Sequence, residues 1–199
     1  MRLKVVQAGE PVLREAARRL SADEISSREI QQLIEAMKET MRDAPGVGLA
    51  APQVGYPLQL TVIEDRPEYT KDAPREQLAE RERKPVPFHV IINPELTLLG
   101  EPEIEFFEGC LSLAGFMAIV ARTRKVRVEC LDEHAKRRAI EATGWYARIL
   151  QHEIDHLHGR LYIDRMSARS LTTLDNYNRH WKDKSVAEAK AILAADFGR

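Results

Sequence analysis

The stretch His152-Glu153-Ile154-Asp155-His156 constrains this chain more than any other, because it predicts a helix and a site together. On an α-helix each residue advances about 100°, so two histidines four positions apart share one face. The preceding residues, Gly144 to Gln151, carry apolar side chains at helical spacing, which predicts that the helix is buried. A buried imidazole needs partners for both ring nitrogens, and a divalent metal ion is one such partner. The alternative is a pair of surface histidines on a charged helix.

A metal ion at this helix would need a third protein ligand, and would leave one position open for chemistry. Glu153 would lie near the ion without ligating it, which suits a general base. Zinc proteases with a His-Glu-x-x-His pattern take the third ligand downstream. Here Tyr162 stands where one class has a histidine, and Glu188 is the only downstream glutamate. Both protease interpretations are therefore weak.

Cys110 is a better candidate for the third ligand. It follows an alternating run at 103–107 that predicts a strand, and Gly109 permits a close turn before it. A thiolate at this corner would complete a Cys-His-His set. The alternative for a lone cysteine is a small buried apolar residue, which is our expectation for Cys130 in the predicted strand 125–131.

A third feature is the glycine-rich segment Gly46 to Gly55. It follows an amphipathic helix predicted at about 27–42, with Ser26 and Glu29 in the pattern of a capping box. Small residues between glycines let the main chain lie against a ligand. The segment lacks the Lys-Ser/Thr of a phosphate loop, and a tight helix-to-strand turn is the alternative.

Together the three segments closely resemble the peptide deformylases. That family is marked by Gly-x-Gly-x-Ala-Ala-x-Gln, Glu-Gly-Cys-x-Ser and Gln-His-Glu-x-Asp-His-x-x-Gly, which stand here in the same order at 46–53, 108–112 and 151–159. The resemblance implies removal of the N-formyl group from the initiator methionine of nascent chains, with release of formate. A general metallopeptidase would not require Cys110 or Gln53. A non-catalytic metal-binding or ribosome-associated protein would have no use for Glu153.

The resemblance also implies a role for each matching residue. The metal would be ferrous iron, often replaced by zinc, nickel or cobalt, and its ligands would be Cys110, His152 and His156. Glu153 would take a proton from the metal-bound water and pass it to the leaving amine. Gln53 and the backbone N–H of Leu111 would donate hydrogen bonds to the formyl oxygen. The main chain of Gly48 would pair with the substrate backbone.

The chain departs from the commonest bacterial pattern at three places. The Glu-Gly-Cys-Leu-Ser segment is followed by Leu113-Ala114-Gly115-Phe116, and Trp145 and Arg148 replace residues that are often small or aliphatic. These features resemble an organelle-type subgroup that also occurs in bacteria. Trp145 and Arg148 are therefore candidate substrate-binding residues. Trp145 would either narrow the pocket for the methionine side chain or only pack the helix against a sheet.

The length and the order of patterns predict the domain organisation. A chain of 199 residues with 44% hydrophobic composition buries one good-sized core. We expect one catalytic domain at 1–165 with a charged surface insertion at about 65–87, followed by a helical extension at 166–199. Predicted strands cluster instead of alternating with helices, which favours an α+β fold. The resemblance implies a central metal-binding helix packed among mostly antiparallel sheets.

Charge and cysteine usage predict partners and location. A net charge of −1 gives no electrostatic case for nucleic-acid or membrane binding, so we expect neither. Two cysteines without a secretory signal or transit segment predict a reducing compartment, and we expect a bacterial cytoplasm. The expected partners are N-formylmethionyl nascent peptides. A ribosome contact through the C-terminal helix, known in some deformylases, and a monomeric or homodimeric state are left open.

Overall fold

The computed structural model describes residues 2–44 and 46–195, and its strands form two antiparallel sheets. The larger sheet has the order β1-β2-β3-β6-β7, and its strands are β1 (Gly48–Ala50), β2 (Leu60–Asp65), β3 (Val86–Leu98), β6 (Lys125–Leu131) and β7 (Arg137–Thr143). The smaller sheet has the order β4-β5-β8, with β4 (Ile104–Gly109), β5 (Phe116–Arg122) and β8 (Thr172–Thr173). The expected clustering of antiparallel strands is confirmed.

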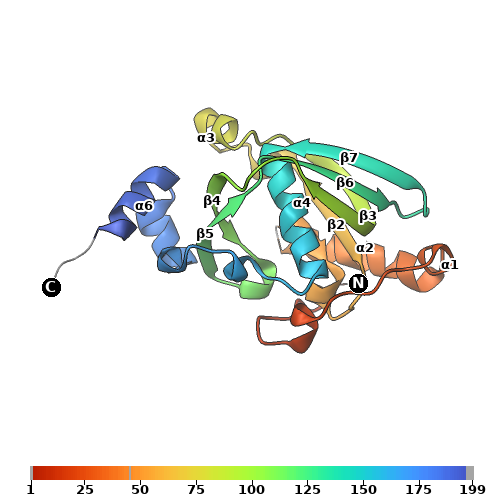
Figure 1. The fold of residues 1–199 in the computed structure, drawn as a ribbon. Coiled ribbons are helices and arrows are strands. Elements are labelled where there is room, and N and C mark those ends of the chain that lie inside the picture. The colour runs from red at the N-terminus through yellow and green to blue at the C-terminus, as the bar shows by residue number, and fades with distance from the viewer. Residues whose placement is uncertain (1, 45, 196–199) are drawn as a thin grey trace.

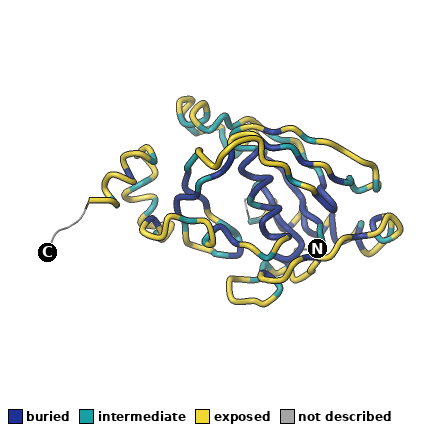
Figure 2. Tube along the Cα trace, in the orientation of Figure 1, coloured by how far each residue is buried: buried dark blue, intermediate teal, exposed yellow. Residues whose placement is uncertain are grey.

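Two helices cover the two faces of the larger sheet. Helix α2 (Arg28–Asp43) packs its apolar stripe, including Leu33 and Met37, on alternate residues of β2 and β3. Helix α4 (Gly144–Leu157) packs on the opposite face, against the intervening residues of β2 and β3 and against β6. Successive strand residues face opposite sides of a sheet, so one run of apolar residues supplies both cores. Figure 1 shows α4 lying between the two sheets, and Figure 2 shows that it is buried along most of its length.

The start of α2 differs from the expected capping box at Ser26 and Glu29. The side chain of Ser27 caps α2 by accepting a hydrogen bond from the N–H of Ile30. Ser26 is already used, because it caps the C-terminus of the short helix α1 (Ala22–Ile25) and its N–H donates a hydrogen bond to the carbonyl of Ala22. The true capping box lies one helix earlier, between Ser21 and Glu24.

The C-terminal segment packs on the side of the small sheet that faces away from α4 (Figure 1). Strand β8 pairs with β5, and α5 (Leu174–Asn176), a π-helical turn at Tyr177–Trp181 and α6 (Val186–Ala194) follow. Ala189 of α6 is fully buried against Phe107 and Ile119, and Lys190 forms an ion pair with Glu105. Val186 and Leu193 also pack in this cluster, whereas Ile192 is exposed.

The charged insertion at 65–87 contains the helix α3 (Arg75–Glu80) and docks on the start of α4. The N–H of Trp145 donates a hydrogen bond to the carbonyl of Arg81 over 2.8 Å. Gly144 has φ +60, and a Cβ there would stand 2.8 Å from the same carbonyl oxygen. Only glycine permits so close an approach. The insertion is thus anchored at the start of α4, while most of its residues are exposed or only partly buried.

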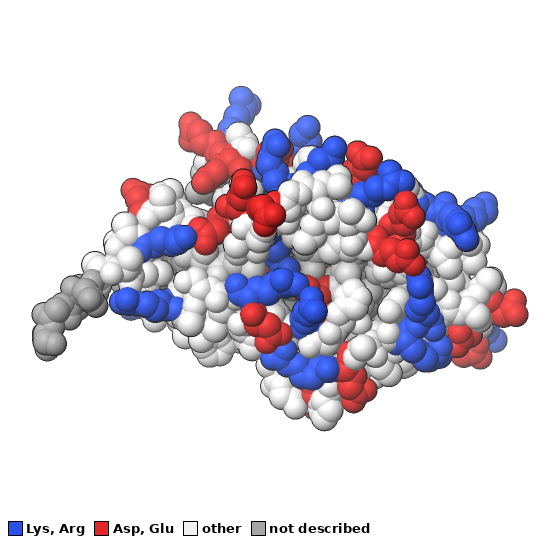
Figure 3. All heavy atoms as spheres, viewed as in Figure 1, with Lys and Arg blue, Asp and Glu red and all other residues white. Residues whose placement is uncertain are grey.

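Acidic and basic side chains are interspersed over the face shown in Figure 3, in keeping with the net charge of −1. Within the described residues, every helix is too short or too polar to span a bilayer.

Candidate metal and catalytic site

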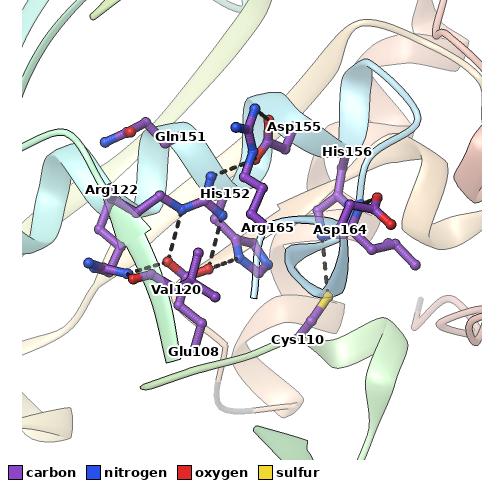
Figure 4. Close-up of polar contacts among 12 residues, drawn as sticks. Glu108, Cys110, Val120, Arg122, Gln151, His152, Asp155, His156, Asp164 and Arg165 are labelled. Carbon is purple, nitrogen blue, oxygen red and sulfur yellow. Dashed lines mark hydrogen bonds and ion pairs between the residues drawn. The ribbon is translucent and has the colours of Figure 1, made fainter. Parts of the chain in front are cut away.

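Two of the three expected ligand residues, Cys110 and His152, line a pocket of about 550 Å³, in the range of small-molecule sites, and His156 is buried beside them. The sulfur of Cys110 and one nitrogen each of His152 and His156 lie within 4.8 Å of one another. Cys110 comes from the end of β4, and both histidines come from the face of α4 that turns toward the small sheet (Figure 4). The Sγ of Cys110 is 3.3 Å from Nε2 of His156. The structure thus confirms that one helix face and one strand end converge.

The surroundings of the two histidines shift their pKa values in opposite directions. Burial alone would lower the pKa of His152, but hydrogen bonds to Cys110 and Glu108 outweigh it and raise the pKa. Burial lowers the pKa of His156, and the nearby charges of His152 and Arg122 add to this effect. His156 is therefore neutral, as a metal ligand must be. One thiol and two imidazoles form a donor set that fits a divalent transition-metal ion.

Glu108 holds His152 in the orientation that a ligand needs. Its Oε2 lies 3.0 Å from Nδ1 of His152, which leaves Nε2 to face Cys110 (Figure 4). The same carboxylate accepts two hydrogen bonds of 3.0 Å from Arg122 and one of 2.6 Å from Arg148. Burial would raise the pKa of Glu108, but His152 and Arg122 hold it far below its usual value. Glu108 is ionised throughout the physiological range.

Asp155 forms a second buried ion-pair centre on the same helix. It accepts hydrogen bonds from Arg122 and from Arg165, which follows α4 in the chain. Arg122 therefore links Asp155 to Glu108. Sequence analysis assigned no role to Glu108, Arg122, Asp155 or Arg165. The sequence contains one indication that Glu108 is buried. Glu108 stands two residues after Phe106 in an alternating strand, so the two side chains point to the same face of the sheet.

Glu153 is buried beside the candidate ligands, and its Oε2 has no hydrogen-bond partner among the described residues. Burial raises the pKa of Glu153 to about 7. A buried carboxyl group without a partner is costly, and such groups concentrate at catalytic sites. A pKa near neutrality suits a group that must both accept and return a proton.

Gly48 lies directly against Glu153, at the edge of the larger sheet. A Cβ at position 48 would overlap the carboxyl group, with the Cγ of Glu153 only 2.7 Å away. Since β1 is an edge strand, one side of its main chain is free to pair with another extended chain.

Gln53 is buried in the turn after β1, and its amide orientation is fixed. The N–H of Ala50 donates to Oε1 over 2.9 Å, so Nε2 is directed at the Sγ of Cys110 and the Oγ of Ser112, at 3.4 and 3.3 Å. Leu111 begins a 3₁₀ turn at Leu111–Leu113 directly after Cys110. The first N–H groups of such a turn have no partner within it. Gln53 and Leu111 thus bring two donor groups to the same end of the pocket.

The two candidate substrate-binding residues on α4 both line the pocket, in different ways. Trp145 is half-buried, and its ring lies beside the guanidinium groups of Arg81 and Arg83. Arg148 is buried, and its donors are used by Glu108 and by the carbonyls of Ile104 and Val120. Arg148 therefore stabilises the ion-pair centre beneath the pocket.

Cys130 is buried in the core between α4 and the larger sheet, as expected. Burial raises the pKa of its thiol to about 11.

Comparison with known proteins gives one consistent result. The profile of a family described as polypeptide deformylase matches residues 2–171. A chloroplastic peptide deformylase 1A of Solanum lycopersicum is 49% identical over 172 residues, which are 86% of this chain and 62% of that protein. Peptide deformylase 3 of Streptomyces avermitilis is 44% identical, over 96% of this chain and 83% of that protein. The chain thus spans less than two thirds of the plant relative and most of the bacterial one.

Solved structures agree with the sequence relatives. The crystal structure of a class I type b peptide deformylase from Acinetobacter baumannii with bound Met-Ala-Ser superimposes with a TM-score of 0.74 at 33% identity. The match covers 83% of this chain and 99% of that one. The expected α+β fold around a central helix is confirmed.

The expected location in a bacterial cytoplasm is overturned by the same comparison. Besides the chloroplastic tomato enzyme, the relatives include a human mitochondrial peptide deformylase at 39% identity. Organellar and bacterial enzymes are thus both similar to this chain, and the sequence features that we used do not separate them.

Proposed function

Since the chain belongs to the polypeptide deformylase family, we propose that it removes the N-formyl group from the N-terminal methionine of newly synthesised proteins and releases formate. One observation carries the proposal. Cys110, His152 and His156 converge beside a buried Glu153, whose Oε2 has no partner among the described residues, and a fixed Gln53; all of these except the buried His156 line one pocket. A metal-dependent hydrolase of a small amide needs these groups together.

Cys110, His152 and His156 would hold the metal ion, and we propose that the ion is ferrous iron. One thiolate and two imidazoles accept iron, zinc, nickel and cobalt, so availability decides which ion is bound. When bound, such an ion supplies Lewis-acid polarisation of a carbonyl and lowers the pKa of water toward about 7. Glu108 fixes His152 for this task through Nδ1.

Glu153 handles the proton in the proposed mechanism. Its carboxylate accepts a proton from the attacking water and later gives it to the nitrogen of methionine, which leaves as the amine. Its position against Gly48 keeps the carboxylate next to the edge strand, where the substrate main chain would pair. The water that attacks would thus be deprotonated next to the position of the formyl carbon.

Gln53 and Leu111 stabilise the charge that develops on the formyl oxygen. The Nε2 of Gln53 and the backbone N–H of Leu111 would donate hydrogen bonds to this oxygen in the transition state. Both donors are held before substrate arrives, by Ala50 in one case and by the 3₁₀ turn in the other. A single preorganised donor of this kind is worth about 3–4 kcal/mol.

The C-terminal segment belongs to the catalytic unit in our proposal. Leu174 lines the pocket, and its N–H donates to the carbonyl of Gly115 in the β4–β5 region. A ribosome contact through this segment remains a second proposal. Because α6 directs Ala189 and Lys190 at the small sheet, such a contact would use the other side of the helix. Co-sedimentation with ribosomes, with and without residues 186–199, tests it.

Formate release tests the proposed function. Protein prepared without oxygen and loaded with ferrous iron or nickel is incubated with a formyl-Met peptide, and an acetyl-Met peptide serves as control. We expect formate from the formyl peptide alone, and none with Glu153→Ala. Absence of formate from protein with a verified metal content contradicts the proposal, as does cleavage within the peptide chain.

A further inference from the structure

The insertion between β2 and β3 brings two arginines to the pocket wall, and only one of them has a counter-ion. Arg83 donates two hydrogen bonds of 2.8 Å to the buried carboxylate of Asp65. Arg81 has no carboxylate within ion-pair distance among residues 2–44 and 46–195. Its guanidinium lies over the rings of Phe106 and Trp145, at 5.2 and 5.1 Å from their centroids. Arg81 is thus a half-buried charge that lines the pocket, stacks on two aromatic faces and has no ion-pair partner among the described residues.

The position of Arg81 is fixed by its backbone and by its neighbour. Its carbonyl accepts the hydrogen bond from Trp145 that docks the insertion on α4, at the close approach to Gly144. The next residue, Glu82, accepts hydrogen bonds of 2.6 and 2.9 Å from Arg124. These contacts fix the backbone at Arg81, and the rings of Phe106 and Trp145 restrain its side chain. A restrained side chain loses less entropy on binding a ligand than a mobile surface arginine does.

The surroundings of Arg81 favour an anionic ligand. Burial lowers the pKa of Arg148, and the charge of Arg81 adds to this effect, which places the two cations in the same electrostatic environment. Glu108, the acid of this wall, is already shared by Arg122, Arg148 and His152. The pocket therefore has an uncompensated positive charge on the side built by the insertion.

We propose that Arg81 is a specificity-determining residue that binds a substrate carboxylate shortly after the formylmethionine, so that chains with Asp or Glu at the second or third position are processed faster. The inference rests on the proposed function, since it concerns the same pocket. Arg81 lines the pocket together with Gln53 and Glu153, and the volume of about 550 Å³ exceeds the needs of one formylmethionyl group. An extended substrate that leaves the catalytic end therefore passes this wall.

Matched peptides test the proposal. The substrates are formyl-Met-Glu-Ala-amide against formyl-Met-Gln-Ala-amide, and formyl-Met-Ala-Glu-amide against formyl-Met-Ala-Gln-amide. The amide end removes the terminal carboxylate, and Gln matches Glu in shape. In one of the pairs we expect kcat/KM to be about fivefold higher for the Glu peptide, the size of one favourable ion pair. The preference should shrink in about 0.5 M NaCl, where the Debye length is only a few ångströms.

Variants assign the preference to Arg81. Arg81→Gln should make the two peptides of the pair equivalent, and Arg81→Lys should retain part of the preference. The control is Arg75→Gln, which removes an exposed charge of the same helix outside the pocket and should leave the preference intact. Equal kcat/KM for Glu and Gln peptides in the unmodified protein overturns the proposal, and so does a preference that survives Arg81→Gln.

A binding measurement separates this proposal from the proposed function. Calorimetry with the product peptides Met-Glu-Ala-amide and Met-Gln-Ala-amide, and with their third-position counterparts, needs no turnover. If no formyl peptide releases formate, the deformylation proposal fails. The anion site is still supported if the Glu peptide binds with a lower Kd than the Gln peptide and Arg81→Gln removes this difference. Equal Kd values for both members of each pair contradict the anion site.

Discussion

The carboxyl group of Glu153 lies against the Cα of Gly48, so close that a methyl group at position 48 would stand 2.7 Å from the Cγ of Glu153. Gly48 and Glu153 are 105 positions apart in the chain, yet each restricts which residue can stand at the position of the other. The glycine at 48 is required because the proposed proton carrier occupies the space of its side chain.

Gly48→Ala should therefore abolish most activity without removing the metal. The added methyl group displaces the Glu153 carboxylate, and a misplacement of about 1 Å costs on the order of 100-fold in rate. The measurement is kcat/KM together with the metal content. The matched control is Gly46→Ala, whose Cβ would meet only the flexible end of Leu111 at 3.0 Å, and which should lose much less activity. Equal effects of the two substitutions would contradict the steric argument.

Glu153→Ala should retain the metal, abolish turnover and leave the protein at least as stable. General acid–base catalysis contributes about 100- to 10,000-fold, and the removed carboxyl group has a buried oxygen without a partner. Thermal unfolding and formate release on one preparation check both parts. An active variant would rule out the proposed proton transfer, and a large drop in Tm would mean that Glu153 is a structural residue.

Glu108→Gln should weaken both the fold and the metal site. The substitution leaves the buried guanidinium groups of Arg122 and Arg148 without their shared anion, which costs on the order of 3–5 kcal/mol. It also changes the group that orients His152, and such changes lower metal affinity by about 10- to 100-fold. Denaturant unfolding and competition with a chelator measure the two effects. Unchanged metal affinity would show that Glu108 acts only in folding.

The two cysteines should differ in reactivity with pH. Because burial raises the pKa of Cys130 to about 11, its thiol stays protonated at pH 8 and should not react with iodoacetamide in the folded protein. Its reactivity should appear only above about pH 10 or on unfolding. Cys110 is partly exposed and should be alkylated in metal-free protein and protected by added metal. Mass spectrometry of labelled peptides reads out both sites, and rapid labelling of Cys130 at pH 8 would refute its burial.

Removal of residues 172–199 should lower stability and impair substrate binding. The truncation uncovers Phe107 and Ile119 and removes Leu174 from the pocket wall. For a chain of this size, each 1 kcal/mol lost lowers Tm by about 2–4 °C. We expect a lower Tm and a raised KM for short formyl peptides. A truncated protein with unchanged Tm and KM would show that the segment is an independent extension.

The secondary structure and the ligand set are predictable from the sequence because they depend on local periodicity. The strand at 125–131 and the buried helix at 144–157 follow from patterns of two and 3.6 residues. The candidate ligands His152 and His156 share a helix face, and the order of motifs points to Cys110 as the third candidate. Sheet order is not local in this sense, since β3 pairs with β6 across the entire β4–β5 hairpin.

The network beneath the site was not predictable for the same reason. Three different elements supply the residues Glu108, Arg122 and Asp155. In the sequence, nothing distinguishes these buried charged residues from the many charged residues at the surface. The pairing of Arg148 with Glu108 shows the same limit, because the sequence does not reveal which carboxylate neutralises a given arginine. The docking of the insertion through Gly144 likewise depends on a contact between distant segments.

Cys110 belongs to the small sheet and both histidines belong to α4, so a bound ion would crosslink positions 46 residues apart in the chain. Closing a loop of this length restricts the unfolded chain and ties stability to occupancy. Oxidation of the Cys110 thiolate would break the crosslink at the step that also ends catalysis. Copies that lose activity in this way would also open more readily at the small sheet, which exposes them to proteases ahead of intact ones. A thiolate ligand at Cys110 would thus link oxidative damage of the site to proteolytic removal of the damaged protein.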